Sequence, residues 1–274
     1  HASFSLGLHE LVPVTLAIDG AAMESTALTA SSFPAQSTTL LMGSSGSGKS
    51  HLALHAALRA VQSDHLAVWL RCDEYERGRL SSLLARAVAP FSTEPPVALF
   101  QKALDLGLTI LVVLDGLNEC FDTVRKQLLE QLSALRLRVP SAVLITSTIR
   151  PQLPDSVAVR EAVLTPPGGN ERATILRSHG LPTGASVPEA FRTPFELSLA
   201  AKCFHELSGN ASQSELLDTY IRLSGASEEV RFGLRIIAGQ MDNNLQMSLS
   251  SADAYAGLRR GGVTAVAIDQ TMAF

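Results

Sequence analysis

The sequence has few cysteines, few aromatic residues and no long apolar run, and two of these shortages exclude whole classes of protein. Its three cysteines, Cys72, Cys120 and Cys203, lie far apart without CxxC spacing, so neither a disulfide framework nor a cysteine zinc site is expected. Scattered reduced thiols are typical of a cytoplasmic protein, which is the location we predict. No apolar run approaches the roughly 18 residues that a membrane-spanning helix requires, so we expect no membrane partner.

An excess of positive charge is also missing. The formal net charge is −4, and no strongly basic helix stands out. Binding to nucleic acid depends on a field of positive charge and is therefore disfavoured. The hydrophobic share of 46% in 274 residues is sufficient for a buried core, which excludes a disordered chain. The length fits one large domain or two to three smaller ones.

Between residues 38 and 165, short apolar runs alternate with amphipathic stretches. The runs predict strands at residues 39–42, 66–70, 109–114, 142–146 and 157–164. The stretches predict helices at residues 49–61, 78–89, 95–107 and 122–139. Strands that alternate with helices indicate βαβ units, so we expect an α/β fold with a parallel sheet flanked by helices. Residues 1–37 form a flanking segment with one further candidate strand at 11–18.

From residue 166 onward the sequence predicts one helix after another. The segment Thr193-Pro194-Phe195-Glu196 has the signature of a helix start, with a Thr cap, Pro at the first helical position and Glu three residues after the cap. Another helix is expected to begin at Asn170 as its cap and to end at Gly180. The other predicted elements are helices at 214–223, 228–241 and 250–261 and a last strand at 263–268.

Residues 43–50, Gly-Ser-Ser-Gly-Ser-Gly-Lys-Ser, match a phosphate-binding loop between a predicted strand and a predicted helix. The glycines let backbone N–H groups turn toward phosphates, and the helix that follows adds the positive end of its dipole. We expect Lys49 to reach the β- and γ-phosphates and the Ser50 hydroxyl to hold Mg²⁺, with ATP as the nucleotide. The expected nucleotide contacts are Gly43, Ser44, Ser45, Gly46, Ser47, Gly48, Lys49, Ser50 and His51.

His51 and His55 are four residues apart on the predicted helix, the spacing of two metal ligands. No third ligand or HExxH pattern accompanies them, so we expect no metal site there.

Two carboxylates follow the apolar run at 109–114. Asp115 ends that predicted strand, which is where a phosphate-loop protein holds Mg²⁺ through water. Glu119 lies four residues further on and has the chemistry of a general base that activates the attacking water. The alternatives are a turn carboxylate for Asp115 and a solvated acid at a helix start for Glu119.

The segment Leu114-Asp115-Gly116-Leu117-Asn118-Glu119 resembles the extended acidic motif of NACHT-type NTPases, a group within the STAND class of signalling ATPases. The first Asp, the Gly and the final Glu match that motif, whereas Asn118 stands where an Asp is usual. Whether Asn118 slows or abolishes hydrolysis stays open at this point.

The resemblance extends to three later segments. Residues 143–147 followed by Arg150 look like the family's sensor segment, which implies that Arg150 contacts the γ-phosphate, although Thr148 and Ile149 separate it from the Thr-Ser pair. Pro194 corresponds to the proline that packs against the nucleotide base. A surface arginine and an ordinary helix start are the alternatives. The domains implied are the phosphate-loop domain at 38–165, a helical domain at 166–225 and the start of a winged-helix domain at 226–274.

The resemblance implies a slow, Mg²⁺-dependent ATPase that acts as a switch. ADP would hold the domains closed, ATP would open them, and the protein would then associate with copies of itself in signalling or antiphage defence, in a bacterial parent. Because the sequence begins at His1 and ends in an apolar run at Phe274, we expect a piece of a longer protein, with effector and sensor domains outside it.

Three alternatives remain open. A different P-loop ATPase, such as a remodelling motor of the AAA type, is the first, and it would be favoured if an arginine finger acted in trans and hydrolysis were fast. A nucleotide-bound scaffold that oligomerises without hydrolysis is a second alternative, to which Asn118 points. DNA binding through the winged helix is the third, and the net charge of −4 disfavours it. The sequence does not distinguish ATP from GTP or give the trigger, the effector or the stoichiometry.

Overall fold

The computed structural model describes residues 14–25, 28, 32–75, 78–120, 122–153, 159–243 and 251–273. The chain forms two compact units. The first unit contains residues 1–178 and 192–195, and the second unit contains residues 179–191 and 196–274. Within the described residues, no helix combines the length and the apolar character that crossing a bilayer requires.

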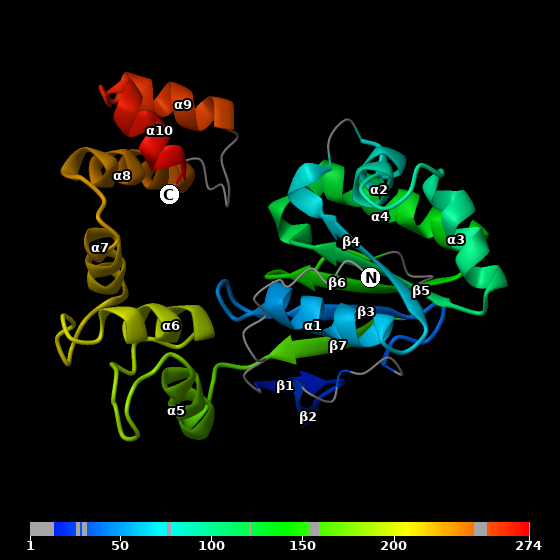
Figure 1. Cartoon of the computed structure of the whole chain (residues 1–274), viewed down its shortest axis with the longest axis horizontal. Helices are drawn as coiled ribbons and strands as arrows, with labels where there is room; N and C mark the ends of the chain where they lie inside the picture. The colour runs from blue at the N-terminus through cyan, green and yellow to red at the C-terminus, as the bar shows by residue number, and fades with distance from the viewer. Residues whose placement is uncertain are drawn as a thin grey trace. The chain divides into compact units, whose positions relative to one another are not determined.

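A seven-stranded sheet forms the centre of the first unit, in the order β2-β1-β7-β3-β6-β5-β4 (Figure 1). Its strands are β1 Thr15–Ile18, β2 Ala21–Glu24, β3 Thr38–Met42, β4 His65–Arg71, β5 Thr109–Asp115, β6 Ser141–Ser147 and β7 Val159–Leu164. The predicted parallel sheet is confirmed for the five strands from β7 to β4. The hairpin of β1 and β2 adds two antiparallel strands, so the sheet is mixed.

The flanking strand is shorter than predicted, and one strand was missed. β1 begins at Thr15, and residues 11–13 of the predicted strand lie outside the described residues. β2 escaped prediction because three of its four residues are exposed, which leaves no alternation of apolar and polar side chains to detect. Residues 157 and 158 of the last predicted strand likewise lie outside the described residues, and β7 is described from Val159.

Helices cover both faces of the sheet. The helix α1 Lys49–Val61 lies on one face, and α2 Leu80–Val88, α3 Pro96–Asp105 and α4 Asp122–Arg138 lie on the other (Figure 1). The buried face of α1 consists mainly of alanines, which let the helix approach the strands closely. Residues 110–114 of β5 are completely buried, as a strand covered on both faces must be. This burial explains the uninterrupted apolar run in the sequence.

The helix α5 Gly169–Ser178 belongs to the first unit, although the sequence suggested a domain boundary at residue 165. The carboxylate of Glu171 accounts for this difference. It accepts hydrogen bonds from the N–H (2.5 Å) and the hydroxyl (2.7 Å) of Thr15 and from the N–H of Gly168 (2.6 Å). Glu171 thus ties the start of α5 to β1 and satisfies a free N–H at the helix start. The expected cap, Asn170, instead lies inside the helix.

The second unit is helical. It contains most of α6 Pro194–Cys203, then α7 Gln213–Leu223, α8 Glu228–Asn243, α9 Ser251–Arg260 and α10 Ala265–Ala273. A hydroxyl caps α7, since Ser212 accepts a hydrogen bond from the N–H of Glu215. The described helices on both sides of residue 226 fall in this same unit, so the expected boundary at 225/226 does not separate two compact bodies.

The predicted strand at 263–268 is wrong, because the chain there enters α10. The Thr264 hydroxyl accepts a hydrogen bond from the N–H of Ala267, and the Thr264 N–H donates to Glu229 at 2.8 Å. Val263, Ala267 and Ile268 pack against Leu258 in a small core. Their spacing is helical, and the β-branched residues in this short run concealed it.

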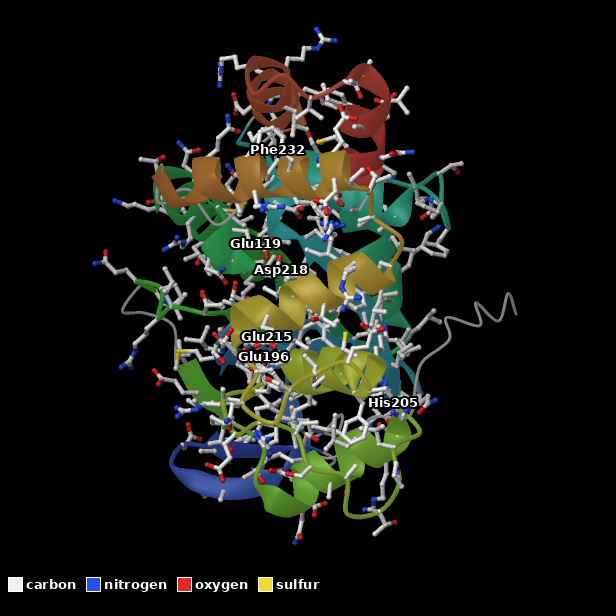
Figure 2. The ribbon with its side chains drawn as sticks, turned by 90° about the vertical axis from the view of Figure 1, so that its left-hand side faces the viewer. Glu119, Glu196, His205, Glu215, Asp218 and Phe232 are labelled. Carbon is white, nitrogen blue, oxygen red and sulfur yellow. The ribbon has the colours of Figure 1, made fainter. Side chains whose placement is uncertain are left out.

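An open polar hollow of about 520 Å³ lies within the second unit, lined by α7, α8 and residues next to them. Glu215 and Asp218 of α7 and Phe232 of α8 are marked in Figure 2. The charged residues that line the hollow are Glu215, Asp218, Glu228, Arg222, Arg231 and Arg235. Since acids and bases balance there, the hollow offers no net field to an anion.

Candidate nucleotide-binding site

The carboxyl ends of the parallel strands bring the predicted site residues to one edge of the sheet. The phosphate loop, residues 43–48, follows β3 directly, and Met42 at the end of β3 pairs with Ser147 at the end of β6. Leu114 of β5 pairs with Ile145 of β6, so Asp115 ends beside them. We name residues 115–119 the acidic loop. Binding sites in open α/β sheets form at this carboxyl edge.

Glycines give the phosphate loop its conformation. Gly46 and Gly48 have φ angles of 72° and 90°, in the left-handed region that other residues rarely adopt. A Cβ atom on Gly43 would lie 2.7 Å from the Ser47 Oγ and 3.1 Å from the Leu164 Cβ, so the loop closes tightly at its first residue. The N–H of Leu52 bonds to the Gly48 carbonyl at 2.8 Å, which starts α1 at the end of the loop.

Lys49 lies across the phosphate loop. Its ammonium group donates to the carbonyl oxygens of Gly43 (3.0 Å) and Ser44 (2.9 Å). Burial lowers the pKa of Lys49, while the negative charges of Asp115 and Glu119 raise it. Lys49, which is predicted to contact phosphate, thus holds its ammonium group beside carbonyl oxygens of the phosphate loop. Phosphate oxygens of a bound nucleotide can replace these carbonyls as acceptors.

Ser50 and Asp115 are brought together as predicted. The Ser50 hydroxyl donates to the Asp115 Oδ1 at 2.8 Å, and the Thr146 hydroxyl donates to the same oxygen at 2.7 Å. A hydroxyl and a carboxylate are hard oxygen ligands of the kind that Mg²⁺ prefers, and Mg²⁺ takes its other ligands from phosphates and water. Within the part of the chain described, no group of three or more His, Cys, Asp or Glu side chains forms a complete metal cage. The donor set therefore fits Mg²⁺ that arrives with a nucleotide.

Glu119 folds back over the start of the acidic loop. It ends the short 3-10 helix η4 Leu117–Glu119, which follows Gly116 with a φ of 75° (Glu119 is labelled in Figure 2). A Cβ on Gly116 would lie 2.8 Å from the Glu119 Cδ, so any larger residue at 116 would have to displace this carboxylate from its present position. Burial raises the pKa of Glu119, as do Asp73 and Asp115, whereas Arg71 and Lys49 lower it. A raised pKa makes a carboxylate a stronger base.

Asp73 and Arg71 are site residues that the sequence reasoning missed. Arg71 ends β4 and is the sheet partner of Asp115. Its guanidinium donates to Asp73, with 2.7 Å between the closest nitrogen and oxygen atoms. The signal was a cluster of charged residues directly after an apolar strand, the same signal that identified Asp115. Without knowledge of the strand order, the sequence did not place β4 beside β5.

Arg150 is in an ion pair with Glu161 of β7, and its side chain is 74% exposed. The guanidinium is thus engaged by Glu161 in this structure, and the contact of Arg150 with the γ-phosphate stays a prediction. Asn118 is also engaged: its amide oxygen accepts a hydrogen bond from the N–H of Thr148 at 2.9 Å.

Residues 192–195 touch the phosphate loop within the first unit. The N–H of Phe195 donates to the Gly46 carbonyl at 3.2 Å. A Cβ on Gly46 would lie 3.0 Å from the Phe195 Cβ and 3.2 Å from the Thr193 Oγ1. Pro194, the predicted base contact, stands between these two residues and is therefore close to the loop. The sequence reasoning singled out Pro194 but missed the contacts of its neighbours.

His51 lies in the first turn of α1, directly after Ser50. Its ring packs edge-on against the ring of His55, with 4.6 Å between the ring centroids. Among the described residues, no group of three or more His, Cys, Asp or Glu side chains that could hold a metal ion includes this pair. The nucleotide contact predicted for His51 stays a prediction.

Comparison with known proteins gives one family and distant likenesses to solved structures, two of which follow. The family model for the NACHT domain matches residues 37–187, more than half of the chain. Among solved structures, PCH-2 of C. elegans is 17% identical with a TM-score of 0.34, covering 69% of this chain and 62% of that chain. The HORMA:CdnC:Trip13 complex of E. coli MS115-1 is 17% identical with a TM-score of 0.41, covering 68% of this chain and 73% of that one. No curated protein matches the sequence.

Proposed function

The chain belongs to the NACHT family of P-loop NTPases, and we propose that it is a Mg²⁺-dependent ATP switch of a larger signalling protein. NACHT domains are NTPases, so nucleotide binding and hydrolysis are the general activity. The observation that supports the finer proposal is the hydrogen bond of Ser50 to Asp115 beside Lys49 and Glu119. Two elements far apart in sequence thus bring together a hydroxyl and a carboxylate that would bind Mg²⁺, beside the residues proposed to contact phosphate and to act as the base.

Each of these residues has a distinct role in the proposed reaction. The amides of the phosphate loop and the Lys49 ammonium bind the phosphate oxygens. Ser50 and Asp115 would hold Mg²⁺, which neutralises charge on the phosphates when bound. Glu119 orients the attacking water and accepts its proton, and the raised pKa of its carboxyl group suits that step.

The switch is supported by the way residues 192–195 contact the phosphate loop. These four residues belong to the first unit, while the residues on both sides of them belong to the second unit. A change at Gly46 on exchange of ADP for ATP is therefore passed through Phe195 to chain segments of the second unit. Switching needs such an element, whose equilibrium depends on the bound nucleotide.

The proposed setting rests on the family alone. We expect ATP-dependent self-association, effector and sensor domains outside these residues, a cytoplasmic location, and a role in signalling or antiphage defence. Slow turnover is part of the same expectation.

A scaffold that binds nucleotide without hydrolysing it is the second candidate. One observation favours it. Arg150 forms an ion pair with Glu161, and none of its described interactions is with the phosphate loop or the acidic loop. In the switch, ATP would have to draw Arg150 away from Glu161 toward the γ-phosphate.

Substitution of Lys49 tests the proposal. Lys49→Ala removes a charged phosphate contact, and we expect ATP affinity to fall at least about tenfold, or about 1.4 kcal/mol. Lys126→Ala is the matched control, since Lys126 is exposed on α4 and should leave affinity as it is. Titration with a fluorescent ATP analogue measures both, and phosphate release by the wild-type protein separates the switch from the scaffold. Equal affinity of the Lys49 variant and the wild type would refute the assignment of the phosphate loop.

A further inference from the structure

The position where this chain departs from the family's acidic motif has a defined contact. Asn118 lies in η4, between Asp115 and Glu119. Its amide oxygen accepts the N–H of Thr148 at 2.9 Å, in a partly buried hydrogen bond between segments 30 residues apart. Thr148 is the first residue after β6, in the loop that carries Arg150.

A second hydrogen bond runs parallel to this one. The N–H of Gly116 donates to the Thr146 hydroxyl at 2.8 Å, and that hydroxyl donates to the Asp115 Oδ1. Residues 116 and 118 of the acidic loop are thus tied to residues 146 and 148. Side chains continue the contact between β5 and β6 past Leu114 and Ile145, the last pair of residues in the backbone register of these two strands.

Glu119 depends on this arrangement because it is the residue next to Asn118. Its N–H bonds to the Gly116 carbonyl at 2.8 Å, so the short turn from 116 to 119 is anchored at its start and at its third residue. On the other side, Ser147 Oγ donates to the Ile149 carbonyl at 2.6 Å, which fixes the loop that leads to Arg150.

We propose that Asn118 is a positioning residue, whose amide oxygen holds the loop after β6 against the acidic loop and so fixes Glu119. It is therefore not the remnant of a lost metal carboxylate. The oxygen of an Asp side chain can accept the same N–H, so Asn and Asp perform this task equally. An additional carboxylate at position 118 would adjoin Glu119, on which the charges of Asp73 and Asp115 already act, and Asn adds no charge there. This inference rests on the proposed function only for its link to hydrolysis.

Two substitutions separate the positioning role from a metal role. Asn118→Asp keeps the acceptor and adds a charge, whereas Asn118→Leu keeps the approximate size and removes the acceptor. We expect Asn118→Asp to retain kcat within about threefold of wild type. Asn118→Leu should lower kcat about tenfold or more while the Kd for ATP changes less than about threefold, because the phosphate loop is untouched and a misplaced base affects the transition state. A rise of more than about tenfold in kcat for Asn118→Asp would show that a metal carboxylate had been missing, and would overturn the proposal.

Hydrogen exchange at the Thr148 amide supplies a readout independent of activity, and the exchange of β5 amides corrects it for a change in global stability. The amide should be protected in the wild type and in Asn118→Asp and should exchange at least tenfold faster in Asn118→Leu, with amides of β5 as the internal reference for an intact fold. Equal protection of Thr148 in all three proteins would overturn the proposal. If the wild type does not hydrolyse ATP, the proposed function fails, yet this measurement still decides the role of Asn118.

Discussion

The phosphate loop and the acidic loop leave the same edge of the sheet but are held in different ways. The phosphate loop is held mostly by its own residues, through glycine conformations, the Lys49 contacts to its carbonyls and the start of α1, with one backbone bond from Phe195 to Gly46. The acidic loop is held by side chains and amides of a neighbouring strand, at Thr146 and Thr148. The residues proposed to bind phosphate thus lie mostly in one contiguous motif. The acidic loop, which carries the proposed base, depends instead on hydrogen bonds to residues about 30 positions along the chain.

The largest expected effect separates the chemistry of the acidic loop from binding. Glu119→Gln keeps the shape of the side chain and removes the base, so turnover should fall roughly 10²-fold or more. ATP should bind with nearly wild-type affinity, because the base matters mainly in the transition state. Phosphate release and nucleotide titration measure the two quantities. Hydrolysis at the wild-type rate in this variant would mean that the base lies elsewhere.

Asp115→Asn should affect both loops, because its carboxylate contacts Ser50 at the end of the phosphate loop motif. We expect about a tenfold or greater loss of Mg²⁺-dependent ATP affinity together with a loss of turnover. Titration with ATP in the presence of Mg²⁺ and of EDTA checks this expectation. The affinity in EDTA should be nearly the same for variant and wild type, and a loss of equal size in EDTA would contradict a role toward the metal.

Gly116→Ala tests how closely the acidic loop is shaped around Glu119. Gly116 and Gly107 have nearly equal φ angles, 75° and 78°. A Cβ atom added at Gly116 would contact the Glu119 carboxylate, whereas a Cβ atom added at Gly107 would have no atom within 4 Å. Both substitutions should cost about 1–2 kcal/mol of stability from the left-handed backbone. Gly116→Ala alone should also lower turnover, by about tenfold, measured beside thermal unfolding. Equal turnover in the two variants would count against the position of Glu119.

The smallest effect is expected at Thr146, one of two hydroxyls that bond to Asp115. Thr146→Val removes the hydroxyl with little change in volume, and with it the hydrogen bond to Asp115 and the acceptor of the Gly116 N–H. Since each such bond is worth about 1 kcal/mol, the Mg²⁺ concentration needed for half-maximal ATP binding should rise at least a few-fold. Thr146→Ser keeps the hydroxyl and should remain near the wild-type value. If the Ser and Val variants were equally affected, packing rather than the hydrogen bond would be responsible.

The sequence predicted the five parallel strands because each is a buried apolar run, and it predicted Lys49, Ser50, Asp115 and Glu119 from local motifs. What it could not predict depends on contacts between distant residues. The carboxylate of Glu171 bonds to Thr15, more than 150 residues away, and the first unit extends to residue 178.

The other discrepancies have similar causes. The exposed strand β2 has no apolar pattern, and the run at 263–268 is too short to distinguish a helix from a strand. Arg71 and Asp73 could be assigned to the site only from the pairing of β4 with β5, which the sequence does not reveal. The partner of Asn118 is likewise visible only in the folded chain.

The strand order also has a consequence for the biosynthesis of the protein. Thr38, at the start of the strand before the phosphate loop, pairs with Val143 and Val159, and Leu16 of β1 pairs with Leu164. A ribosome adds roughly 5–20 residues per second, so the partners of β3 are synthesised several seconds after β3 itself, and β1 cannot pair with β7 before residue 164 has been added. Until β6 has emerged, Asp115 lacks Thr146 and the nucleotide site is incomplete. Nucleotide binding can thus stabilise the nascent first unit only late in its synthesis.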